Sequence, residues 1–237
     1  MKIDVLFDKS SKDKNLRTGW GVSFLIDDRF IFDTGERGDW LLENMDHLKI
    51  GLDGIEGIII SHDHWDHWGG LWDILKKKKG LKVYACPRFG EEFKERVRGL
   101  RAELIEAGGL REISKDIFTT GEIAGSYNGR YMAEQALVAK TGNGISVVTG
   151  CAHPGVVRMI QAAVRGFPGE RVYAALGGFH LMRDDMRAVE MVAEEFRKMG
   201  VKKAGPTHCS GDAAEDIFRQ RYGSDFISVK VGGTIDV

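Results

Sequence analysis

Histidine and aspartate crowd into one short segment of this sequence. His62, His64, Asp66 and His67 follow one another in the order His-x-His-x-Asp-His. In an extended chain, side chains two residues apart point the same way, so His62, His64 and Asp66 are expected to converge, and a turn then brings His67 beside them. Imidazole and carboxylate together suit zinc, iron or manganese. The lack of thiolates in the segment argues against a structural zinc site of the cysteine-rich kind.

Three further histidines stand just past apolar runs elsewhere in the chain: His153, His180 and His208. Ligand sites in α/β proteins commonly lie where strands give way to loops. A single histidine in such a place is more often a strand-end residue bonded to backbone carbonyls. Of the seven histidines, only His47 falls outside this scheme, within an expected helix. The pattern therefore predicts a metal site, with ligands enough for two adjacent ions.

The hydrophobic pattern predicts the elements that must position these residues. Strands are expected over residues 2–7, 20–26, 29–32, 57–60, 81–86, 136–140, 145–149, 171–176, 201–205 and 226–231. Helices are expected over 38–48, 69–79, 88–107, 154–166, 184–199 and 211–222, with a loop-rich stretch over 114–135. Two mixed sheets packed face to face, with helices outside, would satisfy this order.

Length, charge and hydropathy limit the classes of protein to which this chain can belong. The 237 residues suit one large α/β domain or two small ones, and no linker marks a boundary. A formal net charge of −1 argues against a broad nucleic-acid-binding surface. The N-terminus is too short and too charged for a signal peptide, and no apolar run reaches the length of a membrane span, so we expect neither.

The three cysteines, Cys86, Cys151 and Cys209, are a sparse and odd set. They fit a reducing cytoplasm better than a disulfide framework, so a cytoplasmic location is expected. Cys151 and Cys209 lie within two residues of presumed ligands, where thiolate ligation or redox sensing is one interpretation. Small apolar packing beside the site is the preferred one.

These residues resemble the metallo-β-lactamase superfamily, whose signature is His-x-His-x-Asp-His. Three further strings resemble motifs of this superfamily. Phe32-Asp33-Thr34-Gly35 resembles its early aspartate motif, and Thr149-Gly150-Cys151-Ala152-His153 resembles its third motif. Thr207-His208-Cys209-Ser210-Gly211 resembles its last motif. A closer resemblance is to ribofuranosylaminobenzene 5'-phosphate synthase-like proteins of the methanopterin branch. Three strings carry it: Phe118-Thr119-Thr120-Gly121-Glu122-Ile123, Glu134-Gln135-Ala136-Leu137-Val138 and Gly177-Gly178-Phe179-His180-Leu181.

The resemblance implies a fold and a ligand set. The fold is a four-layer αββα sandwich of two mixed β-sheets with outer helices, as one domain over residues 1–237, with a helical and loop cover at about 88–131. The cofactors are two divalent metal ions, zinc being favoured over iron or manganese. The first ion would be held by His62, His64 and His153, and the second by Asp66, His67 and His208.

One feature departs from the pattern of two-metal hydrolases, many of which place a bridging aspartate between the third and last motifs. Here that stretch offers Gly177-Gly178-Phe179-His180, which makes the second metal less secure than the first. His180 could stabilise an oxyanion, donate a proton or act as a further ligand. The alternative is a buried, hydrogen-bonded histidine.

The resemblance implies a metal-dependent hydrolase that acts through a metal-bound hydroxide on a small, phosphorylated or cyclic metabolite. Asp66 would hold the second ion and orient the nucleophile. Asp33 would either fix the tautomer of a ligand histidine or simply form a turn. The alternative function is a transferase-type synthase that joins an aromatic amine to a ribose phosphate in pterin cofactor synthesis. The expected partner is a small-molecule substrate, without nucleic acid or membrane, and the oligomeric state stays open.

Overall fold

The computed structural model describes every residue from Met1 to Val237. The chain forms two compact units. Unit 1 holds residues 1–108 and 230–236, and unit 2 holds residues 109–229 and 237. The prediction that residues 1–237 act as a single domain stays a prediction.

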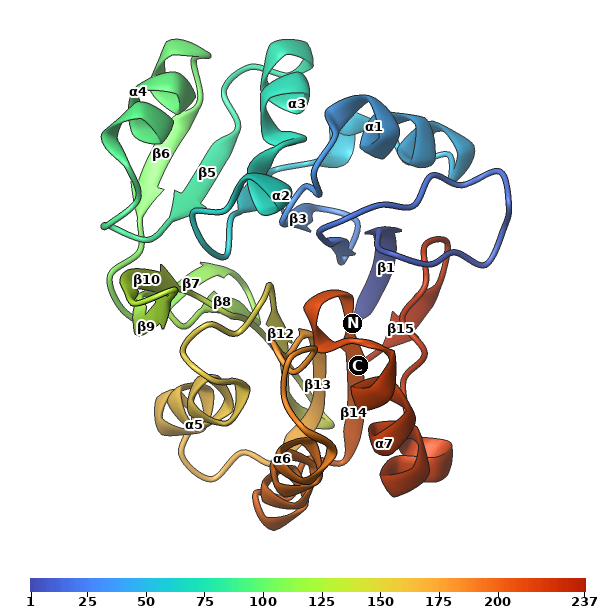
Figure 1. Ribbon diagram of the computed structural model, residues 1–237. Coiled ribbons are helices and arrows are strands. Elements are labelled where there is room, and N and C mark those ends of the chain that lie inside the picture. The colour runs from blue at the N-terminus through green and yellow to red at the C-terminus, as the bar shows by residue number, and fades with distance from the viewer. The chain divides into compact units, whose positions relative to one another are not determined.

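A seven-stranded mixed sheet forms the centre of unit 1, in the order β15-β1-β2-β3-β4-β5-β6 (Figure 1). Its strands are β1 (Lys2–Phe7), β2 (Ser23–Ile26), β3 (Phe30–Phe32), β4 (Gly57–Ile59), β5 (Lys82–Ala85), β6 (Glu103–Glu106) and β15 (Thr234–Asp236). Strands β15 to β3 pair antiparallel, and β3 to β6 pair parallel. The predicted tight turn between β2 and β3 places Asp27 and Asp28 at φ of 52° and 57°, the left-handed values that a two-residue hairpin turn needs.

The helices of unit 1 are α1 (Gly38–His47), α2 (Trp65–Trp68), α3 (Leu71–Lys77) and α4 (Glu91–Gly99), with a short 3-10 turn, η1 (Leu52–Gly54). Helix α1 contacts β1 and α3, and α4 contacts β6. The apolar side chains Leu41 and Met45 of α1 are buried, as their spacing in the sequence predicts.

Unit 2 is built on a six-stranded mixed sheet in the order β14-β13-β12-β11-β8-β7. Its strands are β7 (Arg111–Ser114), β8 (Ile117–Thr119), β11 (Leu137–Thr141), β12 (Gly144–Thr149), β13 (Val172–Gly178) and β14 (Lys203–Thr207). A separate hairpin joins β9 (Ile123–Tyr127) to β10 (Arg130–Glu134). Strands β12, β13 and β14 run parallel, so their carboxyl ends lie at one edge of this sheet.

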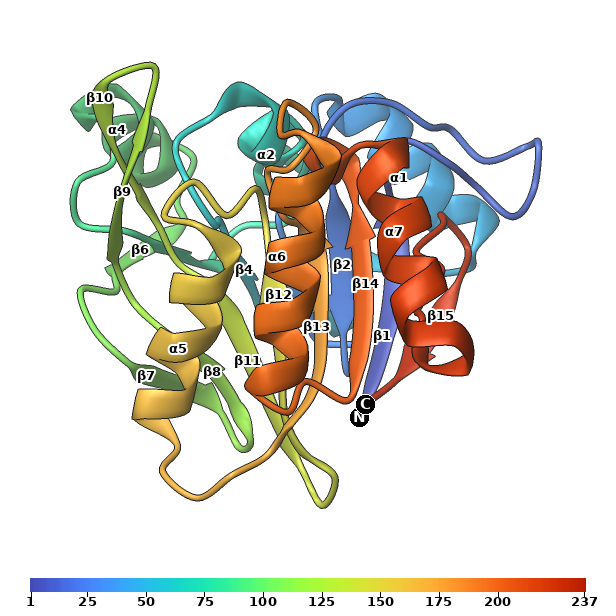
Figure 2. The same cartoon turned by 60° about the horizontal axis from the view of Figure 1, so that its bottom comes forward.

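Three helices, α5 (Val156–Gly166), α6 (Met186–Lys198) and α7 (Asp212–Tyr222), lie side by side along the sheet of unit 2 (Figure 2). The 3-10 turns η2 (His208–Ser210) and η3 (Gly223–Asp225) precede and follow α7. Phe179, Phe196 and Phe218 form a fully buried aromatic cluster with ring centroids 5.3 to 5.6 Å apart. Phe179 directly precedes His180, so this cluster anchors the loop that carries the histidine.

Two mixed sheets with attached helices confirm the predicted α/β class. The helix predicted over 88–107 is wrong in its second half: α4 ends at Gly99, Arg101 takes a φ of 61°, and β6 follows. A left-handed residue cannot continue a helix, and the apolar Leu104 that seemed to prolong the helical period lies in a strand.

The stretch 114–135, predicted to be rich in loops, instead holds β8 and the β9–β10 hairpin. Its turn is Asn128-Gly129, with φ of 49° and 72°, a hairpin signal hidden among the other glycines. The strand predicted over 226–231 is also wrong: this stretch makes only two isolated bridges, at Phe226 and Val231, and the last strand is β15.

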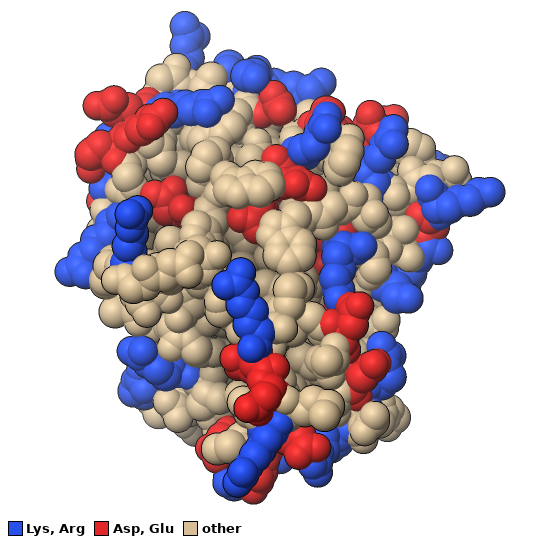
Figure 3. Space-filling model, in the orientation of Figure 1, with Lys and Arg blue, Asp and Glu red and all other residues tan.

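The face drawn in Figure 3 shows basic and acidic side chains interspersed, and neither charge covers a continuous area of its own. None of the helices combines the length and the hydropathy that a membrane crossing requires.

The aromatic cluster of unit 2 generates a stability prediction. Phe196→Ala removes a fully buried ring and should lower the free energy of unfolding by about 3–5 kcal/mol, because the rigid surroundings leave a cavity. Urea unfolding followed by circular dichroism measures the change. Met191→Ala on the same helix is the control, since Met191 is 62% exposed and should change stability by less than about 0.5 kcal/mol.

Candidate functional site

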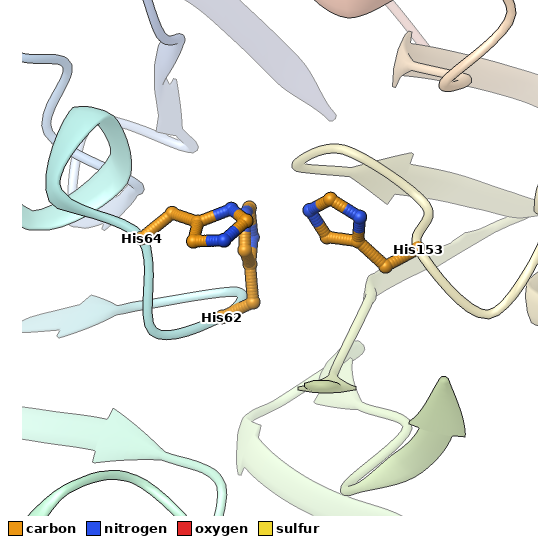
Figure 4. Close-up of side chains that lie close together, drawn as sticks. All are labelled: His62, His64 and His153. Carbon is orange, nitrogen blue, oxygen red and sulfur yellow. The ribbon is translucent and has the colours of Figure 1, made fainter. Parts of the chain in front are cut away.

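The His-x-His-x-Asp-His segment of unit 1 begins two residues after β4. The chain is extended as far as His64, whose φ and ψ are −115° and 140°, and α2 begins at the next residue. Asp66 and His67 therefore reach the cluster from a helical turn, and the predicted strand-like alternation holds only for His62 and His64. Figure 4 shows the rings of these two histidines on the one loop, with centroids 4.8 Å apart.

Asp33 lies beneath this segment and is completely buried. Its carboxylate accepts hydrogen bonds from the Ser61 backbone N–H at 2.7 Å, from Ser61 Oγ at 2.7 Å and from His67 Nδ1 at 2.7 Å. The residue itself has a φ of 55°, so it also forms a tight turn after β3. Asp33 thus fits both interpretations drawn from the sequence, a residue that fixes a histidine tautomer and a residue that forms a turn.

These hydrogen bonds fix the tautomers of two histidines. A carboxylate only accepts, so His67 carries its proton on Nδ1. Ser61 Oγ gives its single proton to Asp33 and therefore accepts from His62 Nδ1, which lies 2.8 Å away. In the neutral form, each histidine then has a lone pair on Nε2, the atom that can bind a metal ion once no proton occupies it.

The Nε2 atom of each ring lies near a further polar atom. His62 Nε2 lies 3.1 Å from His64 Nδ1, and His67 Nε2 lies 3.4 Å from an Asp66 carboxylate oxygen. Each pair of atoms can share a proton or, when both atoms are unprotonated, hold a cation between them. Imidazole and carboxylate suit a divalent ion of borderline softness, so this donor set fits a metal ion such as zinc.

Without a metal ion, the pKa of His67 is strongly perturbed. Burial lowers it, but the charge of Asp33 and the hydrogen bonds that His67 donates to Asp33 and Asp66 outweigh burial and raise the pKa to about 10. The second proton of His67 then lies on Nε2. The resulting positive charge is stabilised by the carboxylates of Asp33 and Asp66. The local electrostatics of this pocket therefore favour positive charge.

The remaining predicted residues lie in unit 2 at the carboxyl ends of three adjacent parallel strands. His153 follows β12, His180 follows β13, and His208 opens the turn after β14. Figure 4 shows the ring of His153 extending from its loop. His153 and His180 have ring centroids 4.5 Å apart, while His208 is fully buried with Nε2 at 3.3 Å from Cys151 Sγ. As their positions after predicted strands indicate, these three histidines lie at one edge of the sheet.

Glu134, at the end of β10, holds the loop that carries His153. Its buried carboxylate accepts hydrogen bonds from the consecutive backbone N–H groups of Cys151, Ala152 and His153, at 2.9, 2.8 and 2.8 Å. Ala152 takes a φ of 62° within this loop. Three charge-assisted hydrogen bonds to one carboxylate therefore fix the backbone from which His153 projects.

His180 is exposed, so the alternative of a buried, hydrogen-bonded histidine is wrong as to burial, although the ring does share a hydrogen bond with Cys209. Its φ is 58°, and its ring faces Tyr127 of β9 at 6.0 Å as well as His153. A hydrogen bond with Cys209, followed by the nearby charges of Cys209 and Glu134, outweighs partial burial and raises the pKa of His180.

Cys151 and Cys209 are both buried, as small packing residues would be. Burial raises the pKa of the Cys209 thiol, but the hydrogen bonds from Cys151 and His180 and the charge of His180 lower it by more. The thiols contact imidazoles as well as apolar neighbours, which simple packing does not require. Cys151 and Cys209 lie with His208 in one group whose donor atoms are all within 4.8 Å of one another.

Sequence reasoning missed two positioning residues, Ser61 and Glu134. Ser61 directly precedes His62, the first histidine of the motif. A hydroxyl group at that position was the only feature of the sequence that could have indicated its role. Glu134 ends a strand that also carries Arg130 and Tyr131, so an acidic residue there does not stand out in the sequence. Its partners lie 17 to 19 residues further along the chain, so no local pattern could name them.

Asp33→Asn should weaken metal binding by the motif. The amide can accept from Ser61 but presents an N–H₂ group where His67 needs an acceptor, so the Nδ1-protonated tautomer is lost. Loss of such a partner typically costs roughly 10- to 100-fold in metal affinity. Zinc competition against a chromophoric chelator measures it, with the exposed Asp53→Asn as control. An unchanged affinity would contradict the tautomer relay.

Glu134→Gln should destabilise the protein and loosen the loop of His153. Glutamine can accept from part of the amide cluster, but its own N–H₂ group then faces the remaining amide. We expect a loss of about 1–3 kcal/mol in the free energy of unfolding. Urea unfolding measures the loss, and faster amide hydrogen exchange at Cys151 to His153 would locate it. Unchanged exchange at these amides would contradict the assignment.

Comparison with known proteins extends these observations to the whole chain. A sequence model described as the metallo-beta-lactamase superfamily matches residues 21–156. A protein of Methanocaldococcus jannaschii named 7,8-dihydropterin-6-methyl-4-(beta-D-ribofuranosyl)-aminobenzene-5'-phosphate synthase is 32% identical over 91% of this chain and 89% of its own. An uncharacterized protein of the same archaeon is 27% identical and covers 99% of this chain and 100% of its own.

Solved structures show the same relationship. A crystal structure described as a metal-dependent hydrolase of the beta-lactamase superfamily is 29% identical, with a TM-score of 0.82 over 100% of this chain and 99% of that one. The short form of human tRNase Z is 14% identical, with a TM-score of 0.63 over 100% and 99%, which shows a shared fold. The chain therefore has the metallo-β-lactamase fold, as predicted, and it belongs to the metallo-β-lactamase superfamily, where it resembles the ribofuranosylaminobenzene phosphate synthase-like group.

Proposed function

We propose that this protein is a metal-dependent hydrolase that acts on a small, phosphorylated or cyclic metabolite. The observation that carries the proposal is the Asp33 relay, which protonates Nδ1 of His62 and of His67 and leaves both Nε2 atoms as metal donors. Membership of the superfamily and the likeness to a metal-dependent hydrolase, 29% identical over the full chain, support the reaction class.

The order of the superfamily motifs supports the ligand assignment. We assign one ion to His62, His64 and His153, and the other to Asp66, His67 and His208. Zinc is the proposed metal because imidazole and carboxylate donors suit it, with iron or manganese as alternatives.

Divalent ions in such a site supply Lewis acidity, which lowers the pKa of water and polarises a substrate oxygen. The chain's own residues have separate tasks. Asp33 and Glu134 hold the two ligand loops, and Asp66 orients the nucleophile. His180, with its raised pKa and exposed position, donates a proton to the leaving group.

The second candidate is a synthase-type transfer reaction. Two observations favour it. The first is the 32% identity to a synthase over most of the chain. The second is that β13 ends in a glycine pair and is followed by Phe179 and His180, where many two-metal hydrolases place a bridging aspartate. In such a reaction an aromatic amine, in place of water, would attack the electrophilic carbon of a phosphorylated substrate, displace its phosphate or diphosphate group by breaking the C–O bond, and give up one proton.

Metal content should be about two ions per chain in protein purified without a chelator or a metal-binding tag, as in two-metal sites. Plasma mass spectrometry measures the content. His62→Ala and His208→Ala should each lower it, while His47→Ala, on α1, should leave it unchanged. One ion or fewer in the unaltered protein would contradict the paired assignment and would give transfer chemistry priority.

Isotope labelling separates hydrolysis from transfer. The protein, loaded with zinc, is incubated in ¹⁸O-water with bis(p-nitrophenyl) phosphate and simple lactones as probes. Hydrolysis predicts ¹⁸O in the released phosphoester or hydroxy acid, and loss of turnover after chelation. Turnover only when an aromatic amine such as aniline is added, with no ¹⁸O in the product, would overturn hydrolysis in favour of transfer.

A further inference from the structure

The two cysteines of unit 2 converge from neighbouring strand ends. Cys151 follows β12, Cys209 lies in η2 after β14, and β13 runs between these two strands. Both thiols are buried, with 5% and 7% of each residue exposed. The two strands that flank β13 therefore deliver two sulfur atoms and the imidazole of His208 to one place.

The end of β13 makes room for this convergence. An added Cβ at Gly178 would lie 2.7 Å from Cys209 Sγ and 3.2 Å from the Cα of Cys151. At Gly177, with a φ of 118°, an added Cβ would meet the Thr149 carbonyl oxygen at 2.0 Å. The pair of glycines is thus required for the close approach of the two thiol-bearing loops over the middle strand.

The distances match those of shared metal coordination. Cys151 Sγ lies 3.3 Å from His208 Nε2, and the donor atoms of Cys151, His208 and Cys209 all lie within 4.8 Å of one another. Zn–S and Zn–N bonds at a tetrahedral angle separate sulfur from nitrogen by roughly 3.5 Å. The donors therefore need only small movements to bind one ion.

We propose that Cys151 and Cys209 are thiolate ligands, together with His208, of a thiophilic divalent ion in unit 2. This rests on the proposed metal-dependent function and names two further donors for the ion assigned to His208. Each thiol gives up its proton when the metal–sulfur bond forms, so two protons are released per ion bound. Thiolates stand in for the missing bridging carboxylate and select zinc or cadmium over magnesium, calcium or manganese.

The alternative is that both thiols stay neutral: Cys151 shares a hydrogen bond with His208 Nε2 at 3.3 Å, and Cys209 donates its S–H to the Cys151 carbonyl oxygen at 3.5 Å. The two arrangements differ in one spectroscopic property. A thiolate bound to cadmium absorbs in the ultraviolet through sulfur-to-metal charge transfer, and a neutral thiol in a hydrogen bond does not.

The test is a titration of metal-free, full-length protein with Cd²⁺ under a phosphine reductant. We expect a charge-transfer band that saturates with Cd²⁺ bound to the His208 site. Cys151→Ser and Cys209→Ser should each halve the band, and the double variant should abolish it. Cys86→Ser is the matched control, because Cys86 is a buried thiol of unit 1 that contacts the Ser61 carbonyl, and it should leave the band intact.

The outcomes separate this inference from the proposed function. Cadmium bound at full stoichiometry without a band would overturn thiolate ligation and leave the metal-dependent function standing. No cadmium bound at all would overturn both. Because the band is measured first on the unaltered protein, the inference can be refuted even if a serine variant fails to fold. A band kept by the double variant but lost with Cys86 would also overturn it.

Discussion

A buried carboxylate must find hydrogen-bond donors, because an ionised group without them is costly to remove from water. Two such groups govern this molecule. Asp33 is satisfied only when Ser61 and His67 take their observed positions, and Glu134 only when three consecutive amides turn toward it. The shapes of the two loops that carry the histidines are therefore consequences of satisfying two charges.

The same requirement links the loops to chemistry. A histidine binds a metal ion only through a nitrogen that carries no proton, and in unit 1 the proton positions are decided by Asp33. In unit 2 the backbone position of His153 is decided by Glu134. The two carboxylates that position the histidines thus determine which histidine atoms can react. They are therefore as important for interpreting the site as the histidines themselves.

Much of this could be predicted from the sequence, and the limits are physical. The His-x-His-x-Asp-His pattern and the Asp27-Asp28 turn are local, so spacing alone indicates them. The split of 88–107 into α4 and β6 depends on one left-handed residue, Arg101, which no hydrophobic period reveals. The role of Glu134 depends on contacts between separate strands. Long-range hydrogen bonds have no signature in neighbouring residues, and for that reason the sequence indicates the candidate histidines but not the residues that hold them in place.

Four non-glycine residues at these loops adopt left-handed backbone conformations: Asp33, Ala152, His180 and His208, with φ from 52° to 62°. Each such conformation costs of order 1 kcal/mol or more for a residue with a Cβ. Glycine would relieve the cost at all four, and at three of them it would delete a functional side chain. The chain therefore carries a trade-off between stability and function, in which variants selected for heat resistance alone would tend to drift toward glycine at these positions and lose their chemistry.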